Sequence, residues 1–216
     1  MTLAATRPVN QTGEGRSIRV DLQLIADMIE PGGRVLDIGC DDGALLAYLT
    51  HRKGVDGRGI ELSQTQVNAA VRSGLAVIQG DADTDLVFYP DASFDYVVLS
   101  QTLQAVSEPR RVLGELVRIG RRAIISFPNF GHWRVRLQLL TTGRMPVTGL
   151  LDQPWYATPN IHLCTIRDFM ALCGELGLVI ERGFVLNRAG QKLPFNVPGR
   201  LANLCGEQAV FMGKRA

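Results

Sequence analysis

Apolar and polar positions follow one another along this chain in a pattern that predicts alternating strands and helices. Short apolar runs, typical of strands buried on both faces, occur at 34–38, 75–79, 94–100 and 123–127, and 55–61 is predicted to be a further strand that ends in an acid. Amphipathic helical stripes occur at 18–29, 43–52, 63–73 and 109–118. Because strand–helix–strand units place their strands parallel with right-handed crossovers, the pattern predicts an open, mostly parallel α/β sheet covered by helices on both faces.

The regular alternation stops after residue 128. Residues 129–164, rich in tryptophan, proline and arginine, are predicted to form an insert over the edge where ligands bind in such sheets. A helix at 165–176 and two apolar runs at 178–187 and 207–212 then predict a closing pair of antiparallel strands, seven strands in all. Residues 1–15 look like a flexible leader, which leaves a single domain over 16–216.

Composition adds few constraints to this picture. The 216 residues carry a formal net charge of only +2 and a globular share of hydrophobic residues, so bulk attraction to nucleic acid is not expected. No apolar run is long enough for a membrane span, and residues 1–16 lack the apolar core of a signal peptide. Four scattered cysteines without a C-x-x-C pair favour reduced thiols over a disulfide framework or a metal site, so we expect a cytoplasmic protein. They are Cys40, Cys164, Cys173 and Cys205.

Charge is unevenly distributed along the chain. Acidic residues clearly outnumber basic ones over 21–108, whereas arginine dominates 109–144. The arginines there are Arg110, Arg111, Arg118, Arg121, Arg122, Arg134, Arg136 and Arg144. They form either a solvated helix face or a surface for an acidic partner or anionic substrate, and the few aromatics among them disfavour single-stranded nucleic acid.

The junction of the first predicted strand with its helix carries a glycine loop, Asp37-Ile-Gly-Cys-Asp-Asp-Gly43. Glycines let the backbone approach a ligand, and the free N–H groups of the helix point at it. The spacing is not the G-x-G-x-x-G of a dinucleotide site, although an ordinary turn would also explain it. The loop resembles the Asp-x-Gly-x-Gly-x-Gly of class I methyltransferases, which holds S-adenosylmethionine, with Asp41 in place of the second glycine.

Further candidates stand at the ends of the later strands. Glu61 ends the second strand, where a carboxylate can accept hydrogen bonds from both ribose hydroxyls, and Leu62 offers either a face for adenine or a core side chain. By the same resemblance, Asp81 would accept a bond from the adenine amine and Ala82 would supply a backbone N–H. The complete set of expected cofactor-binding residues is Asp37, Gly39, Cys40, Asp41, Gly43, Glu61, Leu62, Asp81, Ala82 and Ser100.

Asp41 is the departure that matters within this set. Aspartate tolerates a left-handed backbone at a cost of about 1 kcal/mol, so the turn can survive. Its carboxylate would repel the cofactor's carboxylate by roughly 4 kcal/mol at 4 Å and an effective dielectric of about 20, unless it turns to solvent or meets the ammonium. The sequence therefore predicts weakened binding of the cofactor.

Catalytic residues are harder to identify. Methyl transfer is a displacement at an activated carbon, so positioning can suffice without an acid or base. The segment 100–104 lacks the Asn/Asp-Pro-Pro-aromatic motif of amino-methyltransferases. His132 and His162 flank the insert and are candidate general bases, with a structural role as the alternative for each.

Several blocks resemble one family more specifically, the methionine biosynthesis protein MetW family. These are Arg34–Cys40, Gly59–Ser63, Val77–Asp83, Phe94–Gln104, the Ser-Phe-Pro-Asn-Phe-Gly-His-Trp of 126–133, and Pro154–Cys164. The resemblance covers about residues 17 to 187 and implies a Rossmann-like class I methyltransferase fold that binds S-adenosylmethionine or S-adenosylhomocysteine.

The same resemblance implies a role in methionine synthesis beside homoserine O-acyltransferase. Two functions follow from it: a partner or activator of that enzyme, or an active S-adenosylmethionine-dependent methyltransferase acting on a small molecule or protein. Asp41 and the arginines favour the first, and the otherwise intact binding positions favour the second. Whether the chain is an enzyme stays open at this point.

Overall fold

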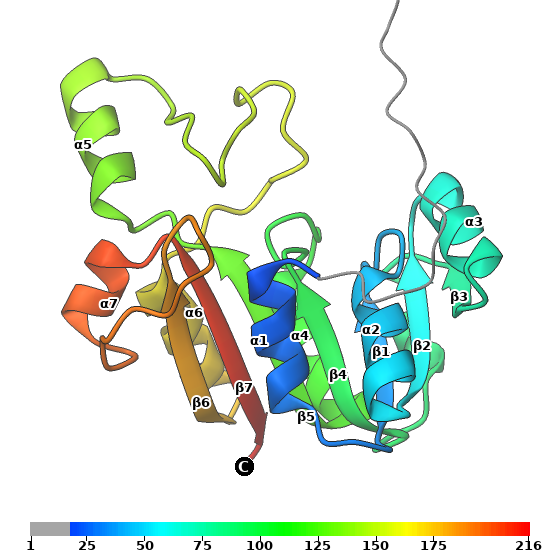
Figure 1. Cartoon of the computed structure of the whole chain (residues 1–216). Coiled ribbons are helices and arrows are strands. Elements are labelled where there is room, and N and C mark those ends of the chain that lie inside the picture. Colours follow the sequence, from blue (N-terminus) through cyan, green and yellow to red (C-terminus); the bar gives the residue numbers. More distant parts are fainter. Residues whose placement is uncertain (1–17) are drawn as a thin grey trace, which may run out of the picture.

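A single seven-stranded sheet organises the protein, and its strand order is β3-β2-β1-β4-β5-β7-β6 (Figure 1). The computed structural model describes residues 18–216, so the predicted leader over 1–15 lies outside the described residues. The strands are β1 (Arg34–Ile38), β2 (Asp56–Glu61), β3 (Ala76–Gln79), β4 (Phe94–Ser100), β5 (Gly120–Pro128), β6 (Leu178–Leu186) and β7 (Gln208–Arg215). Strands β1 to β5 pair in parallel, whereas β7 pairs antiparallel with both β5 and β6.

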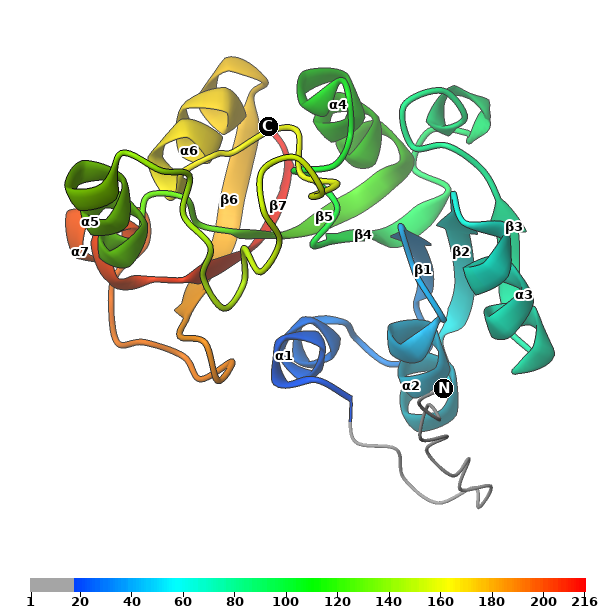
Figure 2. The same cartoon turned by 90° about the horizontal axis from the view of Figure 1, so that it is seen from above.

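Helices cover both faces of the sheet, as the sequence predicts (Figure 2). The helices are α1 (Val20–Met28), α2 (Ala44–Lys53), α3 (Gln64–Arg72), α4 (Pro109–Ile119), α5 (Trp133–Thr142), α6 (Ile166–Glu175) and α7 (Arg200–Cys205), with a 3-10 turn at Leu86–Phe88. Helices α1, α2 and α3 lie on one face, and α4 and α6 lie on the other (Figure 2). Among the described helices, none has the length and apolar character that a membrane span needs.

The core explains why the central strands are apolar at nearly every position. On β1, Leu36 and Ile38 pack toward α4 and α6, while Val35 packs toward α1 and α2. Both faces are therefore buried, which replaces the alternation of a half-exposed strand by a continuous apolar run. Asp37 interrupts this run while remaining only 3% exposed.

The carboxyl ends of β1, β2 and β4 meet at the point where the strand order reverses. Asp37 on β1 is in register with Gly59 on β2 and Val98 on β4. The chain crosses from β1 to β2 on one side and returns to β4 on the other, and ligands of open α/β sheets bind in the crevice at such a reversal. The fold thus places the glycine loop where a ligand is expected.

Every predicted strand and helix is present, with ends that differ by a few residues, but two helices escaped prediction. Helix α5 lies inside the predicted insert and buries only Val135, so its sequence shows no clear apolar stripe. Helix α7 has only six residues and follows a Pro-Gly turn. Both are too weakly amphipathic or too short to be read from periodicity.

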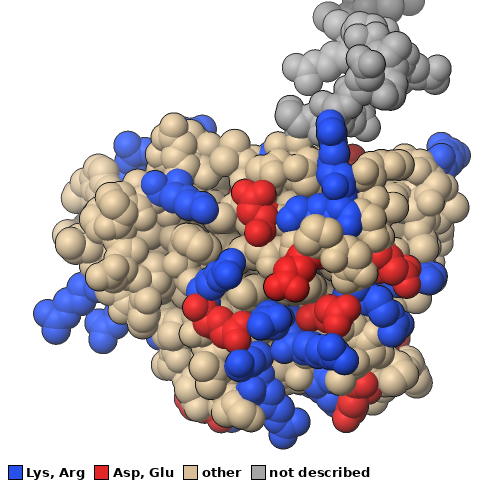
Figure 3. Space-filling model, turned by 60° about the horizontal axis from the view of Figure 1, so that its bottom comes forward, with Lys and Arg blue, Asp and Glu red and all other residues tan. Residues whose placement is uncertain are grey.

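The arginine-rich segment is partly explained by internal ion pairs. Arg118 is only 23% exposed at its side chain and bonds to Glu115, Asp91 and the backbone oxygens of Leu86 and Tyr89. Arg122 pairs with Glu181 at 2.8 Å. On the face of the molecule that Figure 3 shows, basic and acidic side chains are interspersed. The segment is therefore not one continuous anion-binding surface.

Candidate functional site

The glycine loop after β1 has a left-handed backbone at alternate residues. The φ angles are +69° at Gly39, +50° at Asp41 and +79° at Gly43. A Cβ atom on Gly39 would stand 2.5 Å from Thr102 Oγ1, and one on Gly43 would stand 2.4 Å from Leu75 Cδ1. Positions 39 and 43 therefore require glycine on two grounds, whereas position 41 is exposed and aspartate fits there in the predicted conformation.

Glu61 connects this loop to the start of α3. Its Oε2 accepts a hydrogen bond from the backbone N–H of Asp41 at 3.0 Å, and its Oε1 accepts one from the N–H of Ser63 at 2.9 Å. Ser63 stands at the N-cap of α3, but its side chain makes no capping bond. Each carboxylate oxygen has a second lone pair, so the half-buried Glu61 can still accept two ribose hydroxyls.

Asp37 is the least satisfied polar group of the site. Its carboxylate is buried and Oδ1 has no hydrogen-bond partner among the described residues. Burial, reinforced by the nearby charge of Glu61, raises the pKa of Asp37 to about 7. An unpaired buried acceptor costs about 1–3 kcal/mol, and a cationic ligand group within reach would remove that cost. The residue therefore fits a ligand that carries an ammonium or a sulfonium.

The loop after β3 is fixed by its own carboxylates. Asp81 Oδ1 accepts from the N–H of Asp83 at 2.9 Å, and the Asp81 N–H donates to Asp85 Oδ2 at 2.9 Å. Asp83 accepts from the N–H groups of Ser107 and Glu108 at 2.8 and 2.9 Å, which ties the loop to the start of α4. Among the described residues, Asp81 Oδ2 accepts no bond, so it remains available to a ligand amine.

The side chains of Leu62 and Cys40, two predicted cofactor-binding residues, differ in exposure. Leu62 is 65% exposed, so the core alternative is wrong and its apolar side chain lies open beside Glu61. The Cys40 side chain is buried in a cluster with Leu46 and Val67, and burial raises the pKa of its thiol. Cys40 can therefore meet a ligand through its backbone only.

The loop after β4 contains two residues that the sequence did not point to. Gln101 has a φ of +56° without being glycine, and its N–H donates to Ser126 O at 2.9 Å. The hydroxyl of the predicted residue Ser100 shares a hydrogen bond of 3.1 Å with Ser126 Oγ. Because Thr102, in the same loop, packs under Gly39, this segment connects the glycine loop to β5.

The two histidines have different surroundings. His132 is 5% exposed and caps α5, with Nδ1 accepting from the N–H of Arg134 at 3.3 Å. Burial lowers the pKa of His132, which keeps the ring neutral for that acceptor role. The exposed His162 places Nε2 3.2 Å from Ser107 O. A structural role as a helix cap therefore accounts for His132, while His162 stays a candidate general base.

Asn129, at the base of the insert, was not identified from the sequence as important. It is 2% exposed, and its Nδ2 donates to the backbone oxygens of Asn203 and Gly206 at 2.8 and 2.7 Å. Its Oδ1 accepts from Gly131 N–H at 3.0 Å and Ile166 N–H at 3.2 Å. One side chain thus joins β5, α7 and α6. The other end of the insert is held where two consecutive N–H groups, at 161 and 162, donate to Gln104 O.

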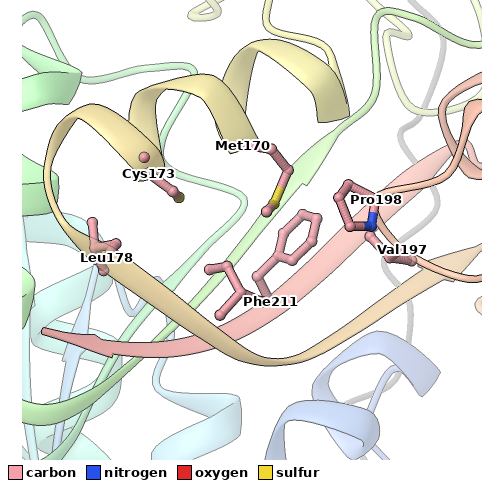
Figure 4. A pocket seen from close by; sticks show the side chains of 8 residues that line it. Met170, Cys173, Leu178, Val197, Pro198 and Phe211 are labelled. Atoms are coloured by element: carbon pink, nitrogen blue, oxygen red, sulfur yellow. The ribbon is translucent and has the colours of Figure 1, made fainter. Parts of the chain in front are cut away.

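Two cavities lie outside the glycine loop. One of about 250 Å³ between α6, β6 and Pro198 has an apolar lining, and burial raises the pKa of its Cys173 to about 12 (Figure 4). The other, of about 290 Å³, lies beside α6 and the end of the insert and includes Gln104 and His162. Neither of these two cavities is lined by a residue of 37–43.

Sequence comparison identifies a single family over nearly all of the chain. The family model described as "Methionine biosynthesis protein MetW" matches residues 19–213. A "Bifunctional methionine biosynthesis protein MetXA/MetW" of Rhodopirellula baltica is 39% identical over 90% of the chain, but the match spans only 32% of that relative. A "Demethylmenaquinone methyltransferase" of Renibacterium salmoninarum is 33% identical over 60% of the chain and 56% of its own length. The chain thus spans well under two thirds of these curated relatives.

Solved structures show the same fold in more distant proteins. A TehB-like S-adenosylmethionine-dependent methyltransferase from Corynebacterium glutamicum superposes with a TM-score of 0.62 at 21% identity, covering 94% of this chain and 90% of its own. A [4+2]-cyclase, SpnF, gives a TM-score of 0.63 at 19% identity, covering 90% and 80%. One fold therefore carries different activities in these neighbours, and it does not by itself assign a reaction.

Proposed function

Since the chain belongs to the methionine biosynthesis protein MetW family, we propose that it acts as a partner or activator of homoserine O-acyltransferase on a fold that binds S-adenosylmethionine or S-adenosylhomocysteine. The observation that carries this proposal is the fused relative, in which a MetXA and a MetW part share one polypeptide. We take the MetXA part to be the acyltransferase that the family resemblance implies. A covalent link keeps two proteins at an effective concentration in the millimolar range, which favours contact between them.

The glycine loop supports a ligand of the S-adenosylmethionine type. Asp37 offers a buried, unpaired oxygen for a cationic group, and Glu61 stands at the end of β2 for a ribose. Asp81 has a free carboxylate oxygen for an amine, and the exposed Leu62, next to Glu61 in the chain, offers an apolar face for a ring. This concentration of carboxylates favours a ligand with a sulfonium and an ammonium over a polyphosphate.

An active methyltransferase is the second candidate. It is favoured by the retained strand-end carboxylates and by the curated methyltransferase among the relatives. When bound, S-adenosylmethionine supplies an activated methyl group. The protein would then have to hold the ligand through Asp37 and Glu61 and orient an acceptor near Gln101 or His162, because positioning alone can support such a displacement.

Purified chain and the homoserine O-acyltransferase of the same organism would test the first proposal. We expect a complex on size-exclusion chromatography and acyl transfer that depends on the chain. Added S-adenosylmethionine should change that rate with the wild type but not with Glu61→Gln, which removes one acceptor from the ribose position. No complex and no effect on acyl transfer would refute the proposal.

The second candidate has a separate readout. Release of S-adenosylhomocysteine, measured with the partner and homoserine present, would support methyl transfer, with Glu61→Gln as the control for ligand binding. Absence of release from a chain that binds S-adenosylmethionine by calorimetry would refute this candidate and leave the first one untouched.

A further inference from the structure

The insert presents an unusual concentration of exposed apolar side chains. We call the following six residues the insert surface: Trp133, Leu137, Leu140, Trp155, Tyr156 and Ile161. Leu140 is 83% exposed, and the two aromatic residues at 155 and 156 are 72% and 76% exposed. Exposed apolar side chains that gather in one region of a protein mark interaction sites.

Helix α5 lacks a partner within the described part of the chain. It buries only Val135 and stands at the outer corner of the molecule, away from both helical layers (Figures 1 and 2). A ten-residue helix is marginal in water without packing, so its apolar sides are available to another protein.

The charged residues on the sequence segment that carries α5 are all of one sign. No acidic residue occurs between Trp133 and Leu151, whereas Arg134, Arg136 and Arg144 all lie there. The guanidinium of Arg134 lies 5.3 Å from the centre of the Trp133 ring, an aromatic–arginine pair of the kind that dominates binding energy in interfaces. A complementary partner face combines an apolar groove with carboxylates at its rim.

The base of the insert holds this surface in place. Asn129 anchors one end through four buried hydrogen bonds, and Gln104 O anchors the other through two. A surface fixed before binding loses less entropy when a partner docks on it.

We propose that the insert surface is the docking surface for homoserine O-acyltransferase, through an apolar groove with an acidic rim on that enzyme. The inference rests on the proposed function, because the fused relative is what identifies the occupant. It adds the place of contact to the proposed function. The partner is proposed to dock on the insert, and not on those arginines of α4 and β5 that already pair with acidic residues of the chain.

Two variants matched in exposure test the proposal. Leu140 is 83% exposed on α5, and Phe88 is 81% exposed at the 3-10 turn, which Arg118 of α4 contacts through a hydrogen bond to Leu86 O. Leu140→Asp places a charge in the proposed contact and should raise the Kd for the acyltransferase about tenfold to a hundredfold. Phe88→Asp should leave it within about twofold. Thermal melting of each variant checks that it is folded.

The wild-type complex supplies a second measurement that needs no substitution. Amide hydrogen exchange over 133–163 should slow when the acyltransferase is added, whereas exchange over 86–89 should not change. If the wild type binds but both variants bind equally well and 133–163 stays unprotected, the docking surface is wrong while the proposed function stands. If the wild type forms no complex, both the proposed function and the docking proposal are overturned. If Leu140→Asp instead dissociates a homodimer of the chain, only the docking proposal is overturned.

Discussion

Replacing Asp41 by glycine should strengthen the binding of S-adenosylmethionine. Asp41 is exposed and left-handed, and its backbone N–H already donates to Glu61. Partial desolvation and the neighbouring carboxylates of Asp42 and Glu61 raise the pKa of Asp41, so negative charge is already crowded there. A ligand carboxylate entering the loop would add to that repulsion.

The size of the effect follows from the charge. The loop is already left-handed at Asp41 in the free protein, so any relief of backbone strain by glycine stabilises the free and the bound forms alike. Two unit charges about 5 Å apart repel by about 0.8 kcal/mol at the dielectric of water and about 3 kcal/mol at an effective value of 20. Because the Asp41 side chain is exposed, the lower part of that range applies, which corresponds to binding about four- to tenfold tighter in Asp41→Gly.

Isothermal titration calorimetry with wild type, Asp41→Gly and Asp41→Asn separates charge from backbone. Asparagine tolerates the left-handed conformation without the charge, so it should recover most of the gain. The gain should shrink in 1 M salt, where the Debye length falls to about 3 Å. Equal affinity of all three proteins would refute the reasoning, and weaker binding by both variants would show that Asp41 meets the ligand's ammonium instead.

Three further predictions concern polar side chains and the stability of the fold. The pKa of Asp37 is about 7 in the folded protein against its ordinary 3.8. Between these values the folded protein retains a proton that the unfolded chain has lost. The contribution of Asp37 to the free energy of unfolding therefore falls as pH rises from about 4 through 7. Urea unfolding across that range should show Asp37→Asn free of this fall, which is at most about 4 kcal/mol. Asn129→Ala should lower the free energy of unfolding by about 3–5 kcal/mol in the same assay, because it orphans four backbone groups, and a loss under 1 kcal/mol would contradict that role. Asp83→Ala should cost about 1–2 kcal/mol through the two N–H groups at the start of α4, and Asp83→Asn should cost less.

The sequence predicted the sheet because its signals are local. Buried parallel strands are continuous apolar runs, and glycines with positive φ, such as Gly39, mark the turns between strand and helix. The alternation of strands and helices therefore predicted the first five strands, and two later apolar runs predicted β6 and β7. Helix α5 was missed because packing did not impose an amphipathic pattern on it.

The candidate site was predicted only in part, for a similar reason. Asp37 and Glu61 follow from strand ends, but the bonding of Gln101 to Ser126 depends on two strands that are adjacent only in space. The role of Asn129 likewise depends on carbonyl groups more than seventy residues away. A single sequence has no signal for contacts of that kind, so the block at 126–133, which carries the family resemblance, contains Asn129 without indicating its role.

The position of β7 constrains the order in which this sheet can assemble. β7 follows β6 in the chain but lies between β5 and β6, so β6 has no strand to pair with until β7 has been made. During synthesis, β5 and β6 would each present an unpaired edge to neighbouring nascent chains. The slow, long-range pairing of β7 with β5 therefore closes the fold, and a chain stopped within 208–215 loses two strands rather than one.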